Sequence, residues 1–129
     1  MSSPLPAGYG ITTPFGKPGG WAAGYHTGDD YAAPTGTPVL ATASGVLVAN
    51  RWDDSYGWMV ELDTGGVRHR YCHLAHQAPG RHGDQVPAGQ HIGSVGSTGN
   101  STGPHLHYEE RTAPYGYYDH RRPEFNHGT

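Results

Sequence analysis

The sequence predicts a mainly β domain with little helix, and three observations support that fold class. The chain has 21 glycines and 11 prolines among 129 residues, a density of helix breakers that leaves few segments free for a long helix. Only 34% of the residues are apolar, so we expect a small core and short strands joined by structured loops. A hairpin signal at residues 57–73 points directly to antiparallel strands. At this length we expect one domain, residues 1–129.

The first part of the chain combines an irregular segment with a candidate strand pair. Residues 1–24 are rich in glycine and proline with scattered aromatic residues, so we expect an ordered but irregular N-terminal segment. The apolar triplets 39–41 and 46–48 flank Ser44-Gly45. This arrangement predicts two strands that pair with each other.

The hairpin follows. Apolar and polar residues alternate from Gly57 to Asp63, and Thr64-Gly65-Gly66 joins this segment to residues 67–73. By strict alternation the second strand would carry one set of side chains on one face, namely Val67, His69, Tyr71 and His73, and the other set on the opposite face, namely Arg68, Arg70, Cys72 and Leu74. Cys72 would then point away from His73, so we expect it to pack in the interior and not to bind a metal.

The last third of the chain begins with a turn and ends in a tail. Residues 87–90, Pro-Ala-Gly-Gln, form a turn signal that leads into an apolar segment at residues 92–96. We expect the final strand at about residues 104–111. Residues 112–129 form an aromatic and basic tail, for which the sequence predicts no particular structure.

Charge and composition exclude several classes of function. The formal net charge is −3, with one lysine, seven arginines and no basic run, so we do not expect a nucleic-acid partner. We expect no membrane span, because no apolar run is long enough, and no signal peptide, because Met1 starts no basic-then-apolar leader. The single cysteine excludes an intramolecular disulfide. We also expect the protein to be a monomer.

The most informative motif is His105-Leu106-His107. In a β-strand alternate side chains share a face, so His105 and His107 point the same way, about 7 Å apart, while Leu106 points to the opposite layer. This spacing suits two ligands of one metal, or one ligand beside one catalytic base.

A second motif near the N-terminus supplies the missing donors. His26 and Asp30 lie four residues apart with Gly28 between them, and a turn at that glycine can bring both side chains to one point. A catalytic zinc site has three protein ligands drawn from His, Asp, Glu or Cys, plus a water molecule. His26, Asp30 and His107 satisfy this count, whereas one cysteine cannot build a thiolate cage. Asp29 is a rival for the carboxylate.

These motifs belong to a longer ordered set. In chain order the set is His26-x-Gly28-x-Asp30-Tyr31-Ala32-Ala33-Pro34, Gly36-Thr37-Pro38-Val39, Gly45-Val46, Tyr71-x-His73-Leu74, Ala88-Gly89-Gln90-x-Ile92-Gly93 and Ser101-Thr102-Gly103-Pro104-His105-Leu106-His107-Tyr108-Glu109. The set resembles the lysostaphin-like zinc metallopeptidases (LytM-type, peptidase family M23), which cut peptidoglycan peptides. The resemblance covers about residues 10–111.

The resemblance implies a compact antiparallel β-sheet domain in which long loops wall a narrow groove. It implies one zinc ion with His26, Asp30 and His107 as ligands, and it favours Asp30 over Asp29. It also implies that His73 and His105 are catalytic residues that do not bind the metal. Some family members use an upstream tyrosine to support the transition state, and Tyr25 and Tyr9 are the candidates here. The other histidines are expected at the surface or in loops, namely His69, His76, His82, His91, His120 and His127, with His76 and His82 as candidates for the groove rim.

We therefore hypothesise a zinc-dependent endopeptidase that hydrolyses peptide bonds in peptidoglycan. The zinc ion would activate a water molecule, and His105 or His73 would transfer its proton while the other stabilises the developing oxyanion. The expected setting is the bacterial cell wall, with a phage endolysin as the expected origin. A zinc D-alanyl-type carboxypeptidase is a weaker alternative because its His-to-Asp spacing differs. The remaining alternative is a wall-binding or amidase-activating module that does not hydrolyse.

Overall fold

The computed structural model describes residues 3–123, and all regular elements in this range are β-strands. In chain order the strands are β1 (Ile11–Thr13), β2 (Asp29–Ala32), β3 (Pro38–Leu40), β4 (Gly45–Asp53), β5 (Gly57–Thr64), β6 (Val67–Leu74), β7 (Gln85–Val86), β8 (His91–Ser94), β9 (His105–Thr112) and β10 (His120–Arg121). The prediction of a mainly β fold is confirmed. Residues 3–123 form no helix that is long and apolar enough to cross a membrane.

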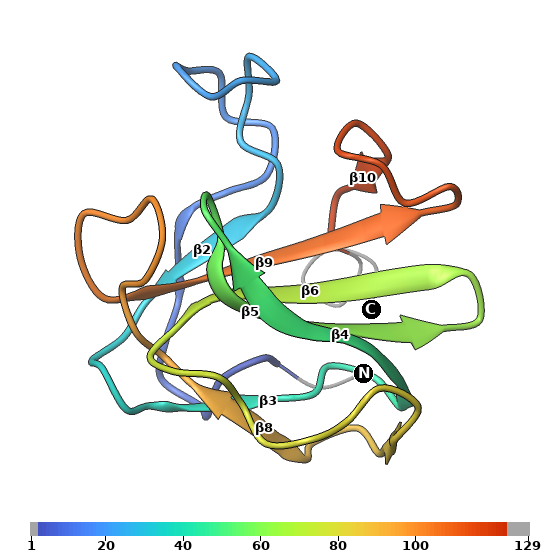
Figure 1. The fold of residues 1–129 in the computed structure, drawn as a ribbon. Coiled ribbons are helices and arrows are strands. Elements are labelled where there is room, and N and C mark those ends of the chain that lie inside the picture. Colours follow the sequence, from blue (N-terminus) through green and yellow to red (C-terminus); the bar gives the residue numbers. More distant parts are fainter. Residues whose placement is uncertain (1–2, 124–129) are drawn as a thin grey trace.

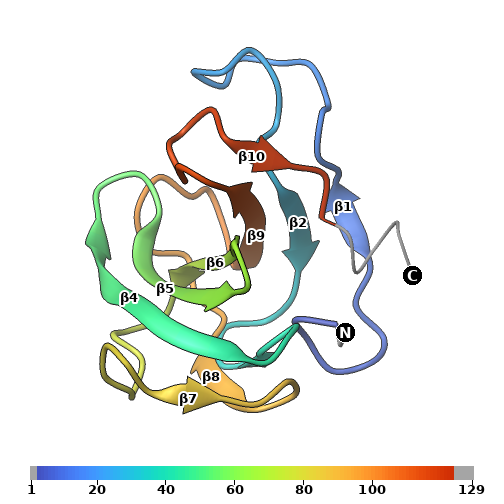
Figure 2. The same ribbon diagram turned by 90° about the vertical axis from the view of Figure 1, so that its right-hand side faces the viewer.

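Eight strands form one antiparallel sheet, shown in Figure 1. The order is β1-β2-β9-β6-β5-β4-β7, with β10 paired to β9, while β3 and β8 form a separate two-stranded sheet. Figure 2 shows how the large sheet curls from β4 through β9 to β1. The central strands β9 and β6 have partners on both sides, so residues that they carry stand on the most restrained part of the fold.

The predicted hairpin is confirmed, since β5 and β6 pair over almost their full length. Its turn holds Gly65 and Gly66, which both have positive φ (54° and 93°). A type I′ turn needs positive φ at its two central positions and matches the twist of the flanking strands, which explains the Gly-Gly pair.

The predicted pairing of segments 39–41 and 46–48 is wrong. Both segments lie in or beside strands, but β3 pairs with β8, and β4 pairs with β5 and β7. The Ala41 N–H donates to the carbonyl oxygen of Gln90, and the Ala41 carbonyl accepts from Gly89. The first segment therefore bonds to a part of the chain about 50 residues away, where Val39 becomes fully buried.

The two faces of β9 have different neighbours. Leu106 and Tyr108 join the apolar core, which also contains Val60, Leu62, Tyr71 and Leu74. His105 and His107 line a groove on the opposite face. We call these the core face and the groove face of β9, and their alternation confirms what the His-x-His spacing predicts.

The two ends of the described chain both add to this sheet. The N-terminal segment is irregular, as predicted, apart from the three-residue strand β1, which pairs with β2. In the tail β10 pairs with β9, opposing His120 to Arg111 and Arg121 to Glu110. The tail thus folds back onto the strand that carries the histidine motif.

Candidate metal centre and active site

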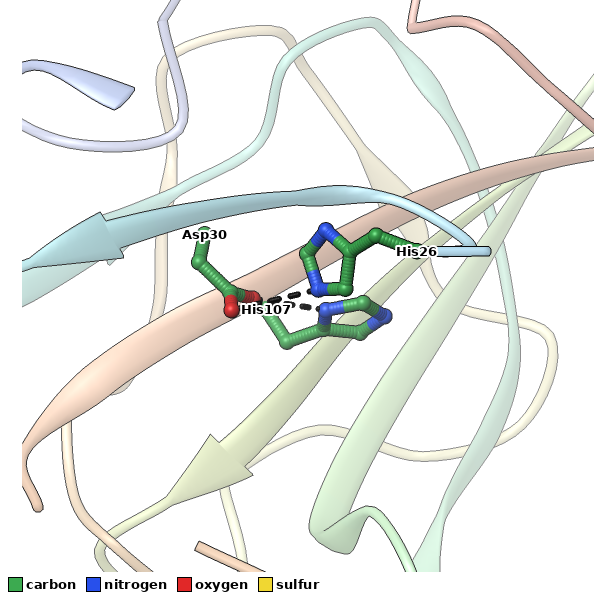
Figure 3. A group of neighbouring side chains, drawn as sticks. All are labelled: His26, Asp30 and His107. Atoms are coloured by element: carbon green, nitrogen blue, oxygen red, sulfur yellow. Dashed lines mark hydrogen bonds and ion pairs between the residues drawn. The ribbon is translucent and has the colours of Figure 1, made fainter. Parts of the chain in front are cut away.

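Three side chains converge on one point, as Figure 3 shows, and all three line the groove. One ligand atom from each of His26, Asp30 and His107 lies within 4.8 Å of the other two. Nε2 of His26 is 3.1 Å from Oδ2 of Asp30, and Nδ1 of His107 is 2.7 Å from Oδ1 of the same carboxylate. Within residues 3–123 this is the one group of at least three such donors.

Strand pairing positions two of the three residues. Asp30 on β2 stands directly opposite His107 on β9, so their side chains leave the sheet on the same face. His26 precedes β2, and the chain returns to the site through Gly28. A Cβ at Gly28 would lie 2.2 Å from the carbonyl oxygen of Tyr108. Gly28 is therefore required by close approach to β9 and not, as the sequence suggests, by an unusual turn conformation.

Asp29 and Asp30 have different surroundings. Oδ1 of Asp29 accepts a hydrogen bond of 2.8 Å from the backbone N–H of Phe15, and Asp29 is fully buried. Asp30 lines the groove and contacts both histidines. The alternation of β2 thus gives one aspartate a role in the N-terminal segment and the other a place in the site.

The charges of this group suit a divalent cation. Burial alone would raise the pKa of Asp30, but hydrogen bonds from His107 and His26 hold it well below its usual range. Burial alone would lower the pKa of His107, but its bonds to Asp30 and Glu109 raise it to about 9. Once a metal replaces the proton on His107, the centre supplies an ionised carboxylate and two imidazoles, which is a donor set that zinc accepts.

Each histidine has a partner on its other ring nitrogen. Nδ1 of His26 lies 3.3 Å from the carbonyl oxygen of Pro14, and Nε2 of His107 lies 2.8 Å from Oε2 of Glu109. Both partners can accept a hydrogen bond from the ring, so Nε2 of His26 and Nδ1 of His107 are the nitrogens that a metal bound beside Asp30 would use. Such outer partners are typical of histidines that bind metals.

His73 and His105 stand beside this centre. Their ring centroids are 4.6 Å apart, and Nε2 of His105 is 3.9 Å from Oδ1 of Asp30. Nδ1 of His73 donates to the carbonyl oxygen of Thr98 (2.7 Å), and Nδ1 of His105 donates to that of Gly103 (2.9 Å). Because those carbonyls can only accept, Nε2 of each neutral ring keeps a lone pair. Burial is the main reason that the pKa of His73 falls to about 4.

The prediction that His73 shares a face with Tyr71 is wrong. His73 has φ = 63°, its N–H donates to the carbonyl oxygen of Tyr56, and the register of β5 and β6 shifts nearby. This left-handed residue breaks the alternation, so His73 lines the groove while Leu74 enters the core. Cys72 stands opposite His107 in the ladder and is buried and free. It lies outside the metal-binding group, which agrees with its predicted packing role.

The groove above the centre has a volume of about 600 Å³. Three loops supply residues to it, at positions 20–22, 53–56 and 100–102, and Tyr117 of the tail joins them. This arrangement confirms the loop-walled groove that the sequence predicts. The aromatic side chains Trp21, Tyr56 and Tyr117 lie among the lining residues, close to the metal-binding group.

Sequence reasoning missed Tyr56, for which no motif gives a signal. Its ring stacks on His107 with centroids 5.9 Å apart and planes 19° from parallel. Of the tyrosines named from the sequence, Tyr25 has its hydroxyl 3.3 Å from the ring of His120, and Tyr9 is 36% exposed. Neither is among the groove residues.

The expectations for the remaining histidines are partly wrong. His69 is 2% exposed and lies inside the protein, not at its surface. His76 and His82 are exposed but are not among the groove residues. His127 lies outside the described residues.

The same fold and motifs occur in known proteins. The model of Peptidase family M23 matches residues 24–119. A DD-carboxypeptidase/endopeptidase (Mpg) from Neisseria meningitidis is 52% identical over 89 residues, which make up 67% of this chain and 20% of that protein. This chain therefore corresponds to about a fifth of that relative's length.

Two solved structures are similar over nearly the whole chain. The catalytic domain of lysostaphin from Staphylococcus simulans has a TM-score of 0.83 and 34% identity, covering 92% of this chain and 91% of that one. A catalytic-domain mutant of the prophage-encoded M23 protein EnpA from Enterococcus faecalis has a TM-score of 0.82 and 36% identity, covering 96% and 95%. With the family match and the His-His-Asp centre, these similarities show that the chain is a lysostaphin-like domain belonging to peptidase family M23.

Proposed function

We propose that this chain is a zinc-dependent endopeptidase that hydrolyses peptide bonds in bacterial peptidoglycan. In this proposal His26, Asp30 and His107 bind one zinc ion, and His73 and His105 are the catalytic histidines. The observation that carries it is the convergence of three donor atoms within 4.8 Å at the floor of a groove, with two further imidazoles beside them. Similarity to lysostaphin and to a DD-carboxypeptidase/endopeptidase supports the substrate class.

The chemistry divides between the metal and the chain. A bound zinc ion supplies Lewis acidity and lowers the pKa of a coordinated water molecule toward neutrality. His73 and His105 each present an Nε2 lone pair, so either ring can accept a proton from the attacking water and return it to the leaving amine. The ring that carries a proton can donate a hydrogen bond to the developing oxyanion.

The groove defines how a substrate would be held. The groove has a volume of about 600 Å³, and His26, Asp30 and His107 are among the residues that line it. Its size suits a short stretch of extended peptide. Aromatic side chains from two loops and the tail wall it, and they offer contact area at a low cost in conformational entropy. The bond to be cut would lie over Asp30, His105 and His107.

The test is digestion of purified cross-linked peptidoglycan from several wall types, with and without a zinc chelator. We expect new free amino groups that vanish with the chelator and return when zinc is added, and mass spectrometry of the fragments identifies the bond. Binding to the wall material without new amino groups on any wall type would overturn the proposal. That result would favour the alternative of a wall-binding or amidase-activating module.

We further propose a phage lysin as the biological setting, which similarity to the prophage-encoded EnpA supports. The position of the gene tests this part separately. A place inside a prophage beside lysis genes would agree with it, and a chromosomal place outside any prophage would contradict it.

A further inference from the structure

The contacts of Glu109 indicate a role for this residue that the His105-Leu106-His107 motif does not predict. We propose that Glu109 is a positioning residue, whose carboxylate holds the neutral His107 ring in the tautomer that presents the Nδ1 lone pair to a metal bound beside Asp30. Tyr56, Thr27 and Arg111 hold Glu109 in turn. This inference rests on the proposed zinc site and adds residues that neither touch the metal nor contact the reacting atoms.

Glu109 lies on the groove face of β9, two residues after His107, and is fully buried. Its Oε2 accepts hydrogen bonds from Nε2 of His107 (2.8 Å), Oγ1 of Thr27 (2.6 Å) and the hydroxyl of Tyr56 (2.8 Å). Its Oε1 accepts a hydrogen bond from Nε of Arg111 and forms an ion pair with Nη2 of the same side chain, both at 2.9 Å. We call these five residues the groove-face network.

The hydrogen-bond donors around Glu109 determine which ring nitrogen of His107 carries a hydrogen. An arginine is always protonated and can only donate, so Arg111 keeps the carboxylate in its acceptor form. In the neutral ring that binds a metal, the nitrogen of His107 that faces Glu109 must then carry the hydrogen, which leaves the lone pair on Nδ1. Nδ1 is the ring nitrogen that lies near Asp30, 2.7 Å from its Oδ1. Without this partner the ring could adopt the other tautomer, which cannot bind a metal at Nδ1.

Tyr56 connects this arrangement to the groove. Its hydroxyl donates to Glu109 and accepts from Nη2 of Arg111 at 3.0 Å, so it bridges both halves of the ion pair. Its ring stacks on His107 and forms part of the groove wall. Tyr56 therefore restrains the ring of His107 from the side while Glu109 holds it from behind.

A carboxamide cannot replace this carboxylate. Donors surround both oxygens of Glu109, so in Glu109→Gln the NH₂ group faces either Arg111 or the trio of His107, Thr27 and Tyr56. The orientation that spares Arg111 places a donor against Nε2 of His107, which favours the wrong tautomer. The change is nearly isosteric, so it tests the hydrogen bonding more than the volume.

The chain offers a matched control in the next residue. Glu110 is also fully buried on β9, and it also pairs through Oε1 with an arginine, Arg121, but it lies on the core face. Glu110→Gln therefore disturbs a comparable buried ion pair on the face of β9 opposite to His107.

The experiment measures the zinc dissociation constant of purified wild type, Glu109→Gln, Glu110→Gln and Tyr56→Phe by competition with a chromophoric chelator. Circular dichroism checks the fold of each protein. We expect zinc affinity to fall about 10- to 100-fold in Glu109→Gln and to stay unchanged in Glu110→Gln. In Tyr56→Phe we expect a loss of about threefold to tenfold, the effect of one hydrogen bond.

Imidazole nitrogen NMR of the zinc-loaded proteins gives a second readout. We expect a protected Nε2 proton on His107 in wild type and its loss in Glu109→Gln. Folded Glu109→Gln with wild-type zinc affinity and an unchanged His107 signal would overturn the inference. If Glu109→Gln does not fold while Glu110→Gln does, the zinc affinity of Tyr56→Phe becomes the deciding measurement. Wild-type zinc affinity in Tyr56→Phe would then count against the positioning role of Glu109. A wild type that binds zinc but cuts no peptidoglycan would contradict the proposed function and leave the role of Glu109 standing.

Discussion

The two faces of β9 carry hydrogen-bond networks of the same residue types, and their comparison shows how position gives them different roles. On the groove face, one oxygen of Glu109 accepts a hydrogen bond from Nε of Arg111 and forms an ion pair with its Nη2, and the other oxygen accepts bonds from Thr27, Tyr56 and His107. One ring nitrogen of His107 is thus held from behind, while the other faces Asp30 and the groove.

On the core face, the corresponding residues form what we call the core-face network. One oxygen of Glu110 accepts a hydrogen bond from Nε of Arg121 and forms an ion pair with its Nη2, and the other accepts a bond from the hydroxyl of Tyr108. That hydroxyl lies 2.7 Å from Nδ1 of His69 and 2.9 Å from Oγ1 of Thr42. His69, Tyr108 and Glu110 are each at most 2% exposed.

The difference lies in what the histidine faces. His69 is enclosed in the core, where a network with satisfied hydrogen bonds stabilises the fold. His107 stands at the boundary between the same sheet and an open groove, where its second nitrogen can bind a metal. The same residue types therefore stabilise the fold on one face and prepare a ligand on the other.

Replacing the histidine of each network should have the largest and most contrasting effects. We expect His107→Ala to lose zinc affinity by more than about 100-fold, and with it activity, because a direct ligand contributes more than an outer partner. We expect His69→Ala to keep its zinc and to lose about 1–3 kcal/mol of stability, because buried partners lose a hydrogen bond. Zinc titration and chemical unfolding of both variants make the comparison. An equal loss of zinc affinity in His107→Ala and His69→Ala would show that the two faces of β9 do not have separate roles.

The two histidines that we propose as catalytic, His73 and His105, should separate activity from metal binding within the groove. We expect His73→Ala and His105→Ala to lose activity about 100- to 10,000-fold, because proton transfer is removed while the three ligands remain. Zinc content by atomic absorption and turnover of a peptidoglycan fragment would be measured on the same preparations. A His73→Ala protein without zinc would refute this division of roles.

Zinc affinity should depend on pH through His107. Hydrogen bonds to Asp30 and Glu109 outweigh burial and raise its pKa to about 9 in the metal-free protein, so below that pH a proton competes with the metal. Affinity should therefore fall as pH falls, by up to about tenfold per pH unit. Competition titrations at pH 6, 7 and 8 measure this slope. Calorimetry in buffers of different ionisation enthalpy should detect a proton released on binding. A flat profile would mean that His107 is already neutral in the metal-free protein.

Removing one hydroxyl from the core-face network should lower stability alone. Tyr108→Phe takes a partner from His69, Thr42 and Glu110, and we expect a loss of about 1–3 kcal/mol in the free energy of unfolding. Zinc affinity and turnover of the folded protein should stay at wild-type values. Thermal unfolding followed by circular dichroism measures the effect, and a tenfold change in zinc affinity would show coupling across the strand.

The smallest effect is expected at the edge of the groove. Tyr117 lines the groove, whereas its neighbour Tyr118 does not and is 69% exposed. We expect Tyr117→Ala to raise KM about twofold to tenfold, the effect of one aromatic contact, with kcat and zinc affinity nearly unchanged. Tyr118→Ala is the matched control and should leave KM as it is. A similar change in both variants would assign the effect to the tail as a whole.

Much of this arrangement could be predicted from local patterns. Alternation along residues 105–109 places both histidines on one face, and the Gly65-Gly66 turn specifies the hairpin. Alternation also places Glu109 beside His107, although the sequence alone gave no reason to assign it a role. The pairing of segments 39–41 and 46–48 failed because strand partners depend on which distant segments bury each other's side chains.

Local pattern also failed at single residues whose conformation depends on their neighbours. His73 has a positive φ that strict alternation cannot foresee, and it reaches the groove only for that reason. His69 has a polar side chain typical of a surface, yet Tyr108 and Thr42 give it partners inside the core. Tyr56 has no motif, and its place against His107 follows from the packing of the loop between β4 and β5.

The sequence by itself determined the types and spacing of the metal-binding side chains, because alternation along a strand is a property of the backbone alone. Only the tertiary structure decided that Asp30 stands opposite His107, 77 residues along the chain, and that Gly28 lets the two strands approach. Such pairing depends on the burial of side chains from the whole domain against the entropy of closing long loops. The distinction between a stabilising histidine and a metal-binding one has the same origin, since only the folded chain places a groove beside one and a core around the other.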